Sequence, residues 1–170
     1  MNDNFEARFH PTQHRKQWIT DLVNENDLKV GCEVGVHQGV TFKYVLDNCP
    51  GMTKHIAIDK WEGKDGLYEQ WLEDLKESLK DDPRAEFIRG FSQDVSDQVE
   101  NNSLDFVFID GDHSFEGCAR DIKHYVPKVK KGGWITGHDI NLTEVRNAVT
   151  LYFNNTWQTA YDNIWYLKKE

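Results

Sequence analysis

The sequence has 170 residues, and its 29 acidic against 20 basic side chains give a net charge of −9, which argues against a nucleic-acid-binding surface. The three cysteines are odd in number and lack metal-ligand spacing, which argues against a disulfide framework or a zinc site. The length suits a single domain over 1–170. Because no stretch has the length and apolarity of a membrane span or a targeting segment, we expect a cytoplasmic protein without a membrane partner.

The chain begins with residues 1–12, for which we predict a loose N-terminal arm. Apolar residues at helical spacing then predict a helix over 13–25 that packs on a sheet. An apolar run and a glycine turn follow over 28–39, and the helix-compatible segment 40–48 stops at a Pro-Gly pair.

The stretch 28–39 organises the rest of the chain. Its apolar run ends in Glu33 and in two glycines, Gly35 and Gly39, directly before a helix. Gly35 allows a sharp turn, and the missing Cβ at both glycines lets a ligand come close. The free N–H groups at the helix start favour a polar or anionic ligand. The spacing Glu-x-Gly-x-x-x-Gly differs from the G-x-G-x-x-G of dinucleotide-binding proteins.

Strand and helix patterns alternate through the remaining sequence. The predicted strands are His55–Asp59, Ala85–Ile88, Leu104–Ile109 and Trp134–Thr136. The predicted helices lie near 68–79, 94–100, 115–126 and 145–153, with Asn141 as the N-cap of the last. Residues 156–168 predict a hairpin with a two-residue turn at Asp162-Asn163.

This alternation predicts an α/β protein with a parallel sheet that is covered on both faces and closed by the antiparallel hairpin. In such sheets, ligands bind at the carboxyl ends of the strands. The polar residues at the five strand ends are Glu33, Asp59, Ser92, Gln93, Asp110, Asp112, His113, His138 and Asp139. We therefore expect a functional site along one edge of the sheet.

Two motifs are specific enough to indicate a family. They are residues 90–94, Gly-Phe-Ser-Gln-Asp, and residues 108–113, Phe-Ile-Asp-Gly-Asp-His. Together with the glycine turn and the Gly-His-Asp ending at 137–139, they make residues 28–168 similar to class I S-adenosylmethionine (SAM) methyltransferases. The chain most resembles the metal-dependent O-methyltransferases of the catechol O-methyltransferase type and their small relatives with an Ile-Asp-Gly-Asp-His signature. The resemblance implies a Rossmann-like, mostly parallel sheet with a C-terminal antiparallel hairpin.

The same resemblance implies which residues bind SAM. Gly35 and Gly39 would line its methionine part, and Asp59 would hold the ribose hydroxyls, since a carboxylate accepts two hydrogen bonds at once. Ser92 and Gln93 would contact the adenine edge. The alternative interpretation of Ser92 and Gln93 is that they are ordinary turn residues, and the alternative for Asp59 is that it is an exposed acid after a strand. The implied cofactor-binding residues are Glu33, Gly35, Gly39, Asp59, Ser92, Gln93 and Asp110.

A divalent ion is also implied, at the ends of the fourth and fifth strands. Asp110, His138 and Asp139 occupy the ligand positions, and two carboxylates with an imidazole suit Mg²⁺ or Mn²⁺. Catechol-type enzymes carry Asp then Asn where this chain has His138 then Asp139. This departure leaves open a site without metal, in which Asp110 is a cap or a substrate contact.

His113 stands three residues after Asp110, where catechol-type enzymes hold a lysine general base. A histidine can take a hydroxyl proton near neutral pH, so His113 is the candidate catalytic residue. The alternative for His113 is a structural one, as the cap of the next helix.

These residues predict a SAM-dependent O-methyltransferase that acts on a small hydroxylated acceptor. Two alternatives stay open: a SAM-binding module without methyl transfer, and another enzyme, hydroxylase-like, on the same scaffold. Because the chain is short, we expect either an open acceptor site or one completed by a second subunit in a homodimer.

Overall fold

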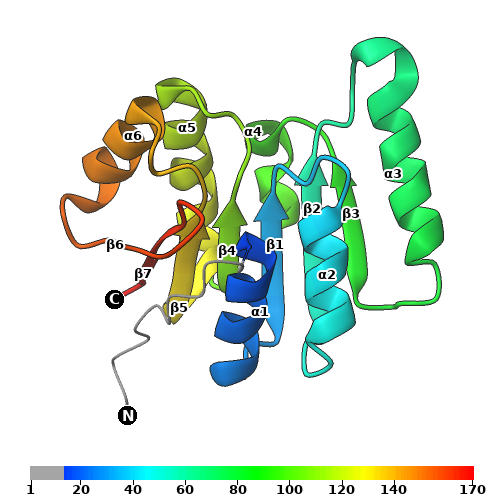
Figure 1. The fold of residues 1–170 in the computed structure, drawn as a ribbon, viewed down its shortest axis with the longest axis horizontal. Helices are drawn as coiled ribbons and strands as arrows, with labels where there is room; N and C mark the ends of the chain where they lie inside the picture. The colour runs from blue at the N-terminus through cyan, green and yellow to red at the C-terminus, as the bar shows by residue number, and fades with distance from the viewer. Residues whose placement is uncertain (1–13) are drawn as a thin grey trace.

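A seven-stranded sheet lies at the centre of the computed structural model, which describes residues 14–170; the predicted arm 1–12 lies outside the described residues. The strand order is β3-β2-β1-β4-β5-β7-β6 (Figure 1). The strands are β1 (Val30–Val34), β2 (Lys54–Asp59), β3 (Ala85–Arg89), β4 (Leu104–Ile109), β5 (Val129–Gly137), β6 (Gln158–Thr159) and β7 (Trp165–Lys168). The helices are α1 (Arg15–Glu25), α2 (Val40–Asn48), α3 (Leu67–Ser78), α4 (Ser92–Val95), α5 (Phe115–Tyr125) and α6 (Thr143–Phe153), with 3₁₀ turns η1 (Lys64–Gly66), η2 (Ser96–Gln98) and η3 (Val126–Lys128).

The pairing of the strands confirms the predicted fold. Strands β1 to β5 pair in parallel, whereas β7 runs antiparallel to both β5 and β6. The hairpin turns through Asp162 and Asn163, whose φ angles are 56° and 57°. Asp and Asn tolerate this left-handed conformation better than most residues, and two such residues in succession give the turn that matches strand twist.

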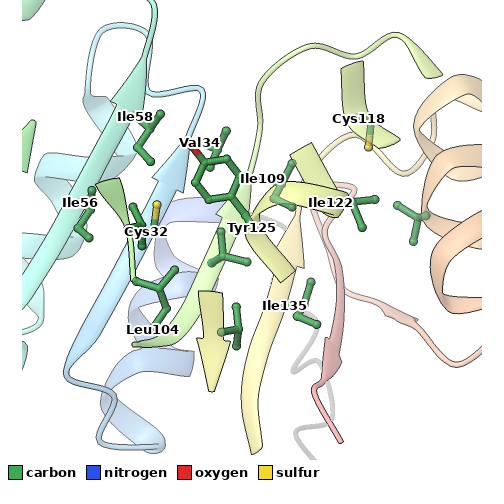
Figure 2. Close-up of a cluster of buried hydrophobic side chains, with 14 of the residues drawn as sticks. Cys32, Val34, Ile56, Ile58, Leu104, Ile109, Cys118, Ile122, Tyr125 and Ile135 are labelled. Atoms are coloured by element: carbon green, nitrogen blue, oxygen red, sulfur yellow. The ribbon is translucent and has the colours of Figure 1, made fainter. Parts of the chain in front are cut away.

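The strand β4 shows why the sheet is covered on both faces. Alternate side chains of a strand point to opposite faces. Phe106 and Phe108 pack with α1 and α2, while Val107 and Ile109 pack with α5 and α6. All four are at most 4% exposed. Figure 2 shows part of the second cluster, in which Tyr125 of α5 lies over the central strands.

The three cysteines are free and buried within this core. Cys32 lies in β1 and belongs to the cluster shown in Figure 2, in which it packs as a small apolar residue. Burial raises the pKa of the Cys49 thiol to about 11 and that of the Cys118 thiol to about 12. No described helix combines the length and apolarity needed to cross a membrane.

Several predicted boundaries differ from the structure. Strand β5 begins at Val129 rather than at Trp134, because the strand continues through an irregularity that contains Gly132. Gly132 has a φ of 79°, and its N–H donates a hydrogen bond to the carbonyl of Lys169. Helix α4 begins at Ser92. The N-cap of α6 is Leu142, which has no side-chain cap, and not Asn141.

His55 is a buried histidine on β2 whose ring lies parallel to that of Phe42, with centroids 4.4 Å apart. Its side chain is 1% exposed, and neither ring nitrogen makes a hydrogen bond of good geometry with the described residues. Burial lowers the pKa of His55 from 6.5 to about 3, which a contact with the Gly31 backbone only partly opposes. The ring is therefore neutral in the folded protein at neutral pH.

We expect acid to destabilise the protein through His55. The unfolded chain binds a proton at this residue below pH 6.5 and the folded chain only near pH 3, so stability falls as pH falls between these values. The loss approaches about 1.4 kcal/mol per pH unit. Denaturant unfolding of wild type and His55→Phe between pH 7 and 5 measures this loss of stability, because the variant has no ionisable group at this position. Equal pH dependence of the two proteins would contradict the assignment.

Candidate functional site

A cavity of about 810 Å³ opens at the edge of the sheet where β1, β2, β3 and β4 end. This volume is within the usual range of ligand pockets, roughly 300–1,000 Å³. Most of its wall is formed by residues 33–38, 58–61, 90–93 and 110–113, and by Asp139. The structure thus brings most of the candidate residues to one cavity, with Gly39 and His138 outside its wall.

Gly35 forms the floor of this cavity, where the exits of β1 and β4 approach each other. Its φ is 90°, and its N–H donates to the carbonyl of Ile58 at 2.8 Å. A Cβ at this position would lie 2.3 Å from the backbone oxygen of Asp110. Only glycine fits here. Beside it, burial raises the pKa of Glu33 well above its usual value, and the nearby Asp110 raises it further.

Gly39 has a different environment. It is the left-handed N-cap of α2, and a Cβ there would lie 2.4 Å from a methyl carbon of Leu75 in α3. Close packing between these two helices therefore accounts for the glycine. A contact between Gly39 and the cofactor stays a prediction.

The carboxylate of Asp59 is fixed by two backbone groups. One oxygen accepts the N–H of His37 at 2.8 Å, and the other accepts the N–H of Trp61 at 2.9 Å. Each carboxylate oxygen has two lone pairs, so both can still accept a hydrogen bond from a ligand. Asp59 is thus held in place between the exits of β1 and β2, open to the cavity.

Aromatic side chains form another part of the wall. Trp61 is 1% exposed, and its indole N–H donates to the carbonyl of His37 at 2.8 Å, so it belongs both to the core and to the cavity. The rings of His37 and Trp71 meet edge to face at 4.3 Å, and Tyr68 lies 4.8 Å from Trp71. Sequence analysis had assigned Tyr68 and Trp71 only to a helix pattern.

Ser92 and Gln93 lie in the first turn of α4 and line the cavity. The hydroxyl of Ser92 donates a short hydrogen bond to the carboxyl group of Asp121, which is 3% exposed and also lines the cavity. Burial raises the pKa of Asp121 to about 6. Sequence analysis missed Asp121, although its position three residues after Cys118 and four before Tyr125 is that of a buried helix face.

Two carboxylates and two imidazoles meet at the ends of β4 and β5. His113 Nε2 lies 2.9 Å from Asp139 Oδ2 and 3.6 Å from Asp110 Oδ1. His138 Nδ1 lies 3.2 Å and 3.7 Å from the same two oxygens. Asp110, His113 and Asp139 offer ligand atoms within 4.8 Å of one another, so His113 stands in this group where the prediction had His138. Two carboxylates with an imidazole fit Mg²⁺ or Mn²⁺.

The two histidines of this cluster differ in access. The side chain of His113 is 47% exposed and lines the cavity, whereas that of His138 is 9% exposed. The neighbouring carboxylates of Asp110 and Asp139 raise the pKa of His113. The N-cap of α5 is Ser114, whose hydroxyl accepts the N–H of Gly117 at 3.1 Å. The alternative of His113 as the helix cap is therefore wrong.

Arg15, in the first turn of α1, is a second residue of the site that sequence analysis missed. Its Nη1 lies 3.2 Å from Asp110 Oδ2 and 3.2 Å from His138 Nδ1. Its backbone N–H donates to Asp162 Oδ2 at 2.8 Å, which joins α1 to the β6–β7 turn. Nothing in the local sequence marks Arg15, because the helix pattern around it reports only an apolar face.

Residues 32–140 match the family model described as a methyltransferase domain. The sequence has no significant match among the curated proteins. The SAH-bound methyltransferase PaMTH1 of Podospora anserina is similar, with a TM-score of 0.72 and 11% identity over 92% of this chain and 78% of that chain. The SAH complex of an O-methyltransferase from Bacillus cereus has a TM-score of 0.68 and 13% identity over 96% of this chain and 83% of that chain. The O-methyltransferase NovP has a TM-score of 0.67 and 17% identity over 91% of this chain and 77% of that chain.

These solved structures share the fold of this chain. The family match is independent of that likeness and extends from β1 to the residue after Asp139. It therefore includes the glycine turn, Asp59 and the cluster at the end of β4. Because the match spans more than half of the sequence, the chain belongs to the methyltransferase-domain family and is a SAM-dependent methyltransferase.

Proposed function

We propose that this methyltransferase methylates a hydroxyl oxygen of a small acceptor, with the assistance of a divalent ion. The observation that carries the proposal is a single cavity with two chemically different ends. One end has a glycine turn and the fixed carboxylate of Asp59, and the other has His113 between two carboxylates. The SAH complexes of neighbours with the same fold support a cofactor at the first end.

At the cofactor end, the chain provides a glycine turn and hydrogen-bonding side chains for SAM. Gly35 lines the part of the cavity in which the methionine part of SAM would lie, and Asp59 would accept both ribose hydroxyls. Ser92 and Gln93 would face the adenine edge from α4, with Ser92 held by Asp121. Bound SAM supplies a methyl group that its sulfonium already activates.

At the acceptor end, the chain aligns the hydroxyl group and removes its proton. Of the two histidines in this cluster, His113 is the one that lines the cavity, so its Nε2 would take this proton. Asp110 and Asp139 hold the imidazole and favour its charged form after the transfer. This chemistry points to oxygen as the methylated atom.

Asp110, His138 and Asp139 would hold the divalent ion beside His113. A bound ion would act as a Lewis acid and lower the pKa of the acceptor hydroxyl. Ligation needs ionised carboxylates and a neutral imidazole, so metal affinity should weaken as the pH falls.

A turnover assay tests this function. Purified protein is incubated with methyl-labelled SAM and a panel of catechols, simple phenols and sugar alcohols, with Mg²⁺ or with a chelator. We expect methylated oxygen in at least one acceptor class and loss of activity in the chelator. SAM binding without turnover on any hydroxylated acceptor would contradict O-methylation, and full activity in the chelator would remove the metal from the mechanism.

Substitution of Asp59 tests the cofactor end separately. Asp59→Ala removes two charge-assisted hydrogen bonds, each worth roughly 1.5–3 kcal/mol, so SAM affinity should fall at least tenfold. Calorimetric titration with SAM measures this, beside the melting curve of the variant. Asp94→Ala is the matched control, since Asp94 is an exposed acid of α4 outside the cavity wall. An unchanged affinity in folded Asp59→Ala would defeat the assignment.

A further inference from the structure

We propose that Arg15 is the resident cation of the acceptor end and exchanges with a divalent ion for contact with Asp110. The inference rests on the metal-assisted function proposed above. It adds that a side chain of this chain competes with the ion.

The contacts of Arg15 place its charge within the candidate ligand set. Its Nη1 lies 3.2 Å from Asp110 Oδ2 and 3.2 Å from His138 Nδ1. The other oxygen of Asp110 faces His113 and His138, at 3.6 Å and 3.7 Å. Arg15 therefore holds two of the three candidate ligands, a carboxylate and an imidazole, from outside the ligand set.

Charge balance explains why a cation is needed there. The side chain of Asp110 is 10% exposed, and a carboxylate removed from water needs a positive or hydrogen-bonding partner. Asp139 adds a second carboxylate within the same cluster. In the structure the partner on Asp110 Oδ2 is the guanidinium of Arg15.

A guanidinium and a divalent ion on one carboxylate repel each other strongly, because both charges lie within a few ångströms. The Arg15 side chain is able to leave. It is 38% exposed, is long and flexible, and borders the cavity. The helix α1 keeps its place meanwhile, because the backbone N–H of Arg15, not its side chain, is bonded to Asp162.

Arg15 therefore lowers the apparent affinity of the site for a divalent ion, since the ion must displace it. Removing the charge should strengthen metal binding, whereas removing a ligand would weaken it. This opposite sign separates a competing cation from a residue that supports the site.

The test is a calorimetric titration with Mn²⁺ of wild type, Arg15→Gln and Arg15→Met, checked by the free Mn²⁺ signal in electron paramagnetic resonance. Both variants should bind Mn²⁺ at least tenfold more tightly than wild type. Lys16→Gln is the matched control, because it removes the same charge one residue later. Lys16 lies over the Tyr44 ring at 4.7 Å and outside the cavity wall, so this variant should bind Mn²⁺ as wild type does.

Each outcome decides the matter. Equal or weaker Mn²⁺ binding by folded Arg15 variants overturns the inference, and leaves the proposed function intact if wild type binds the ion. If the Arg15 variants bind Mn²⁺ tightly and wild type does not bind it, the inference is supported and metal assistance in wild type is contradicted. Binding by neither protein overturns both. Melting curves establish that each variant is folded, and two different substitutions guard against the failure of one.

Discussion

Replacing His113 with alanine is expected to slow the methyl-transfer step by about 10²–10⁴-fold, the usual contribution of a general base. Of the two histidines in the cluster with Asp110 and Asp139, His113 is the one that lines the cavity, and its Nε2 lies 2.9 Å from Asp139. Affinity for SAM should stay unchanged, because the residues proposed to bind it lie mainly at the ends of the other strands. Single-turnover kinetics with saturating SAM measures the step directly.

Two observations control this experiment. His113→Lys restores a basic group and should recover part of the rate. The melting temperature of His113→Ala should change little, because Ser114 rather than His113 caps α5. Full activity in His113→Ala would mean that another group takes the proton of the acceptor hydroxyl. A large loss of stability with a normal rate per folded molecule would instead indicate a structural role for His113.

Gly35→Ala is expected to abolish SAM binding and to destabilise the fold. The new residue would need a φ of 90°, which costs about 1–2 kcal/mol for a residue with a Cβ. Its Cβ would also lie 2.3 Å from the backbone oxygen of Asp110, and such overpacking costs about 1–3 kcal/mol. Together these effects amount to about 2–5 kcal/mol of unfolding free energy, and relief by backbone movement would displace the exits of β1 and β4.

Gly66→Ala separates the two contributions. Gly66 has a φ of 89°, and a Cβ there would meet nothing within 4 Å, so this variant carries the conformational cost alone. Denaturant unfolding and SAM titration of both variants measure the difference. If Gly35→Ala lost no more stability than Gly66→Ala and still bound SAM, the close approach of β1 and β4 would not constrain the site.

The sequence predicted the sheet because its strand signals are strong and local. The run Leu104–Ile109 is apolar except for Asp105, as expected for a central strand covered on both faces, and β4 has these bounds. The helix Val40–Asn48 also begins and ends as predicted, between a glycine and a Pro-Gly pair. The start of β5 was wrong because its glycines lie inside the strand, where sequence patterns read them as a turn.

The candidate site was predictable where its residues follow strands directly. Asp59, Ser92, Gln93, Asp110 and His113 all reach the cavity because parallel strands end at one edge. Arg15 and Asp121 were missed because helices bring them to the site, and only the packed structure determines which helical side chain points there. The acceptor, a homodimer and the place of the protein in the cell stay predictions, since no single-chain geometry bears on them.

The buried cysteines have a consequence for the chemical reactivity of the protein. A thiol reacts with alkylating agents only as the exposed thiolate, and burial suppresses both exposure and ionisation at Cys32, Cys49 and Cys118. Labelling of the native chain then requires the surrounding structure to open. Because Cys32 lies in β1, next to β4 at the centre of the sheet, its modification would record the rarest of these openings. The chain thus contains intrinsic reporters of its own cooperative unfolding.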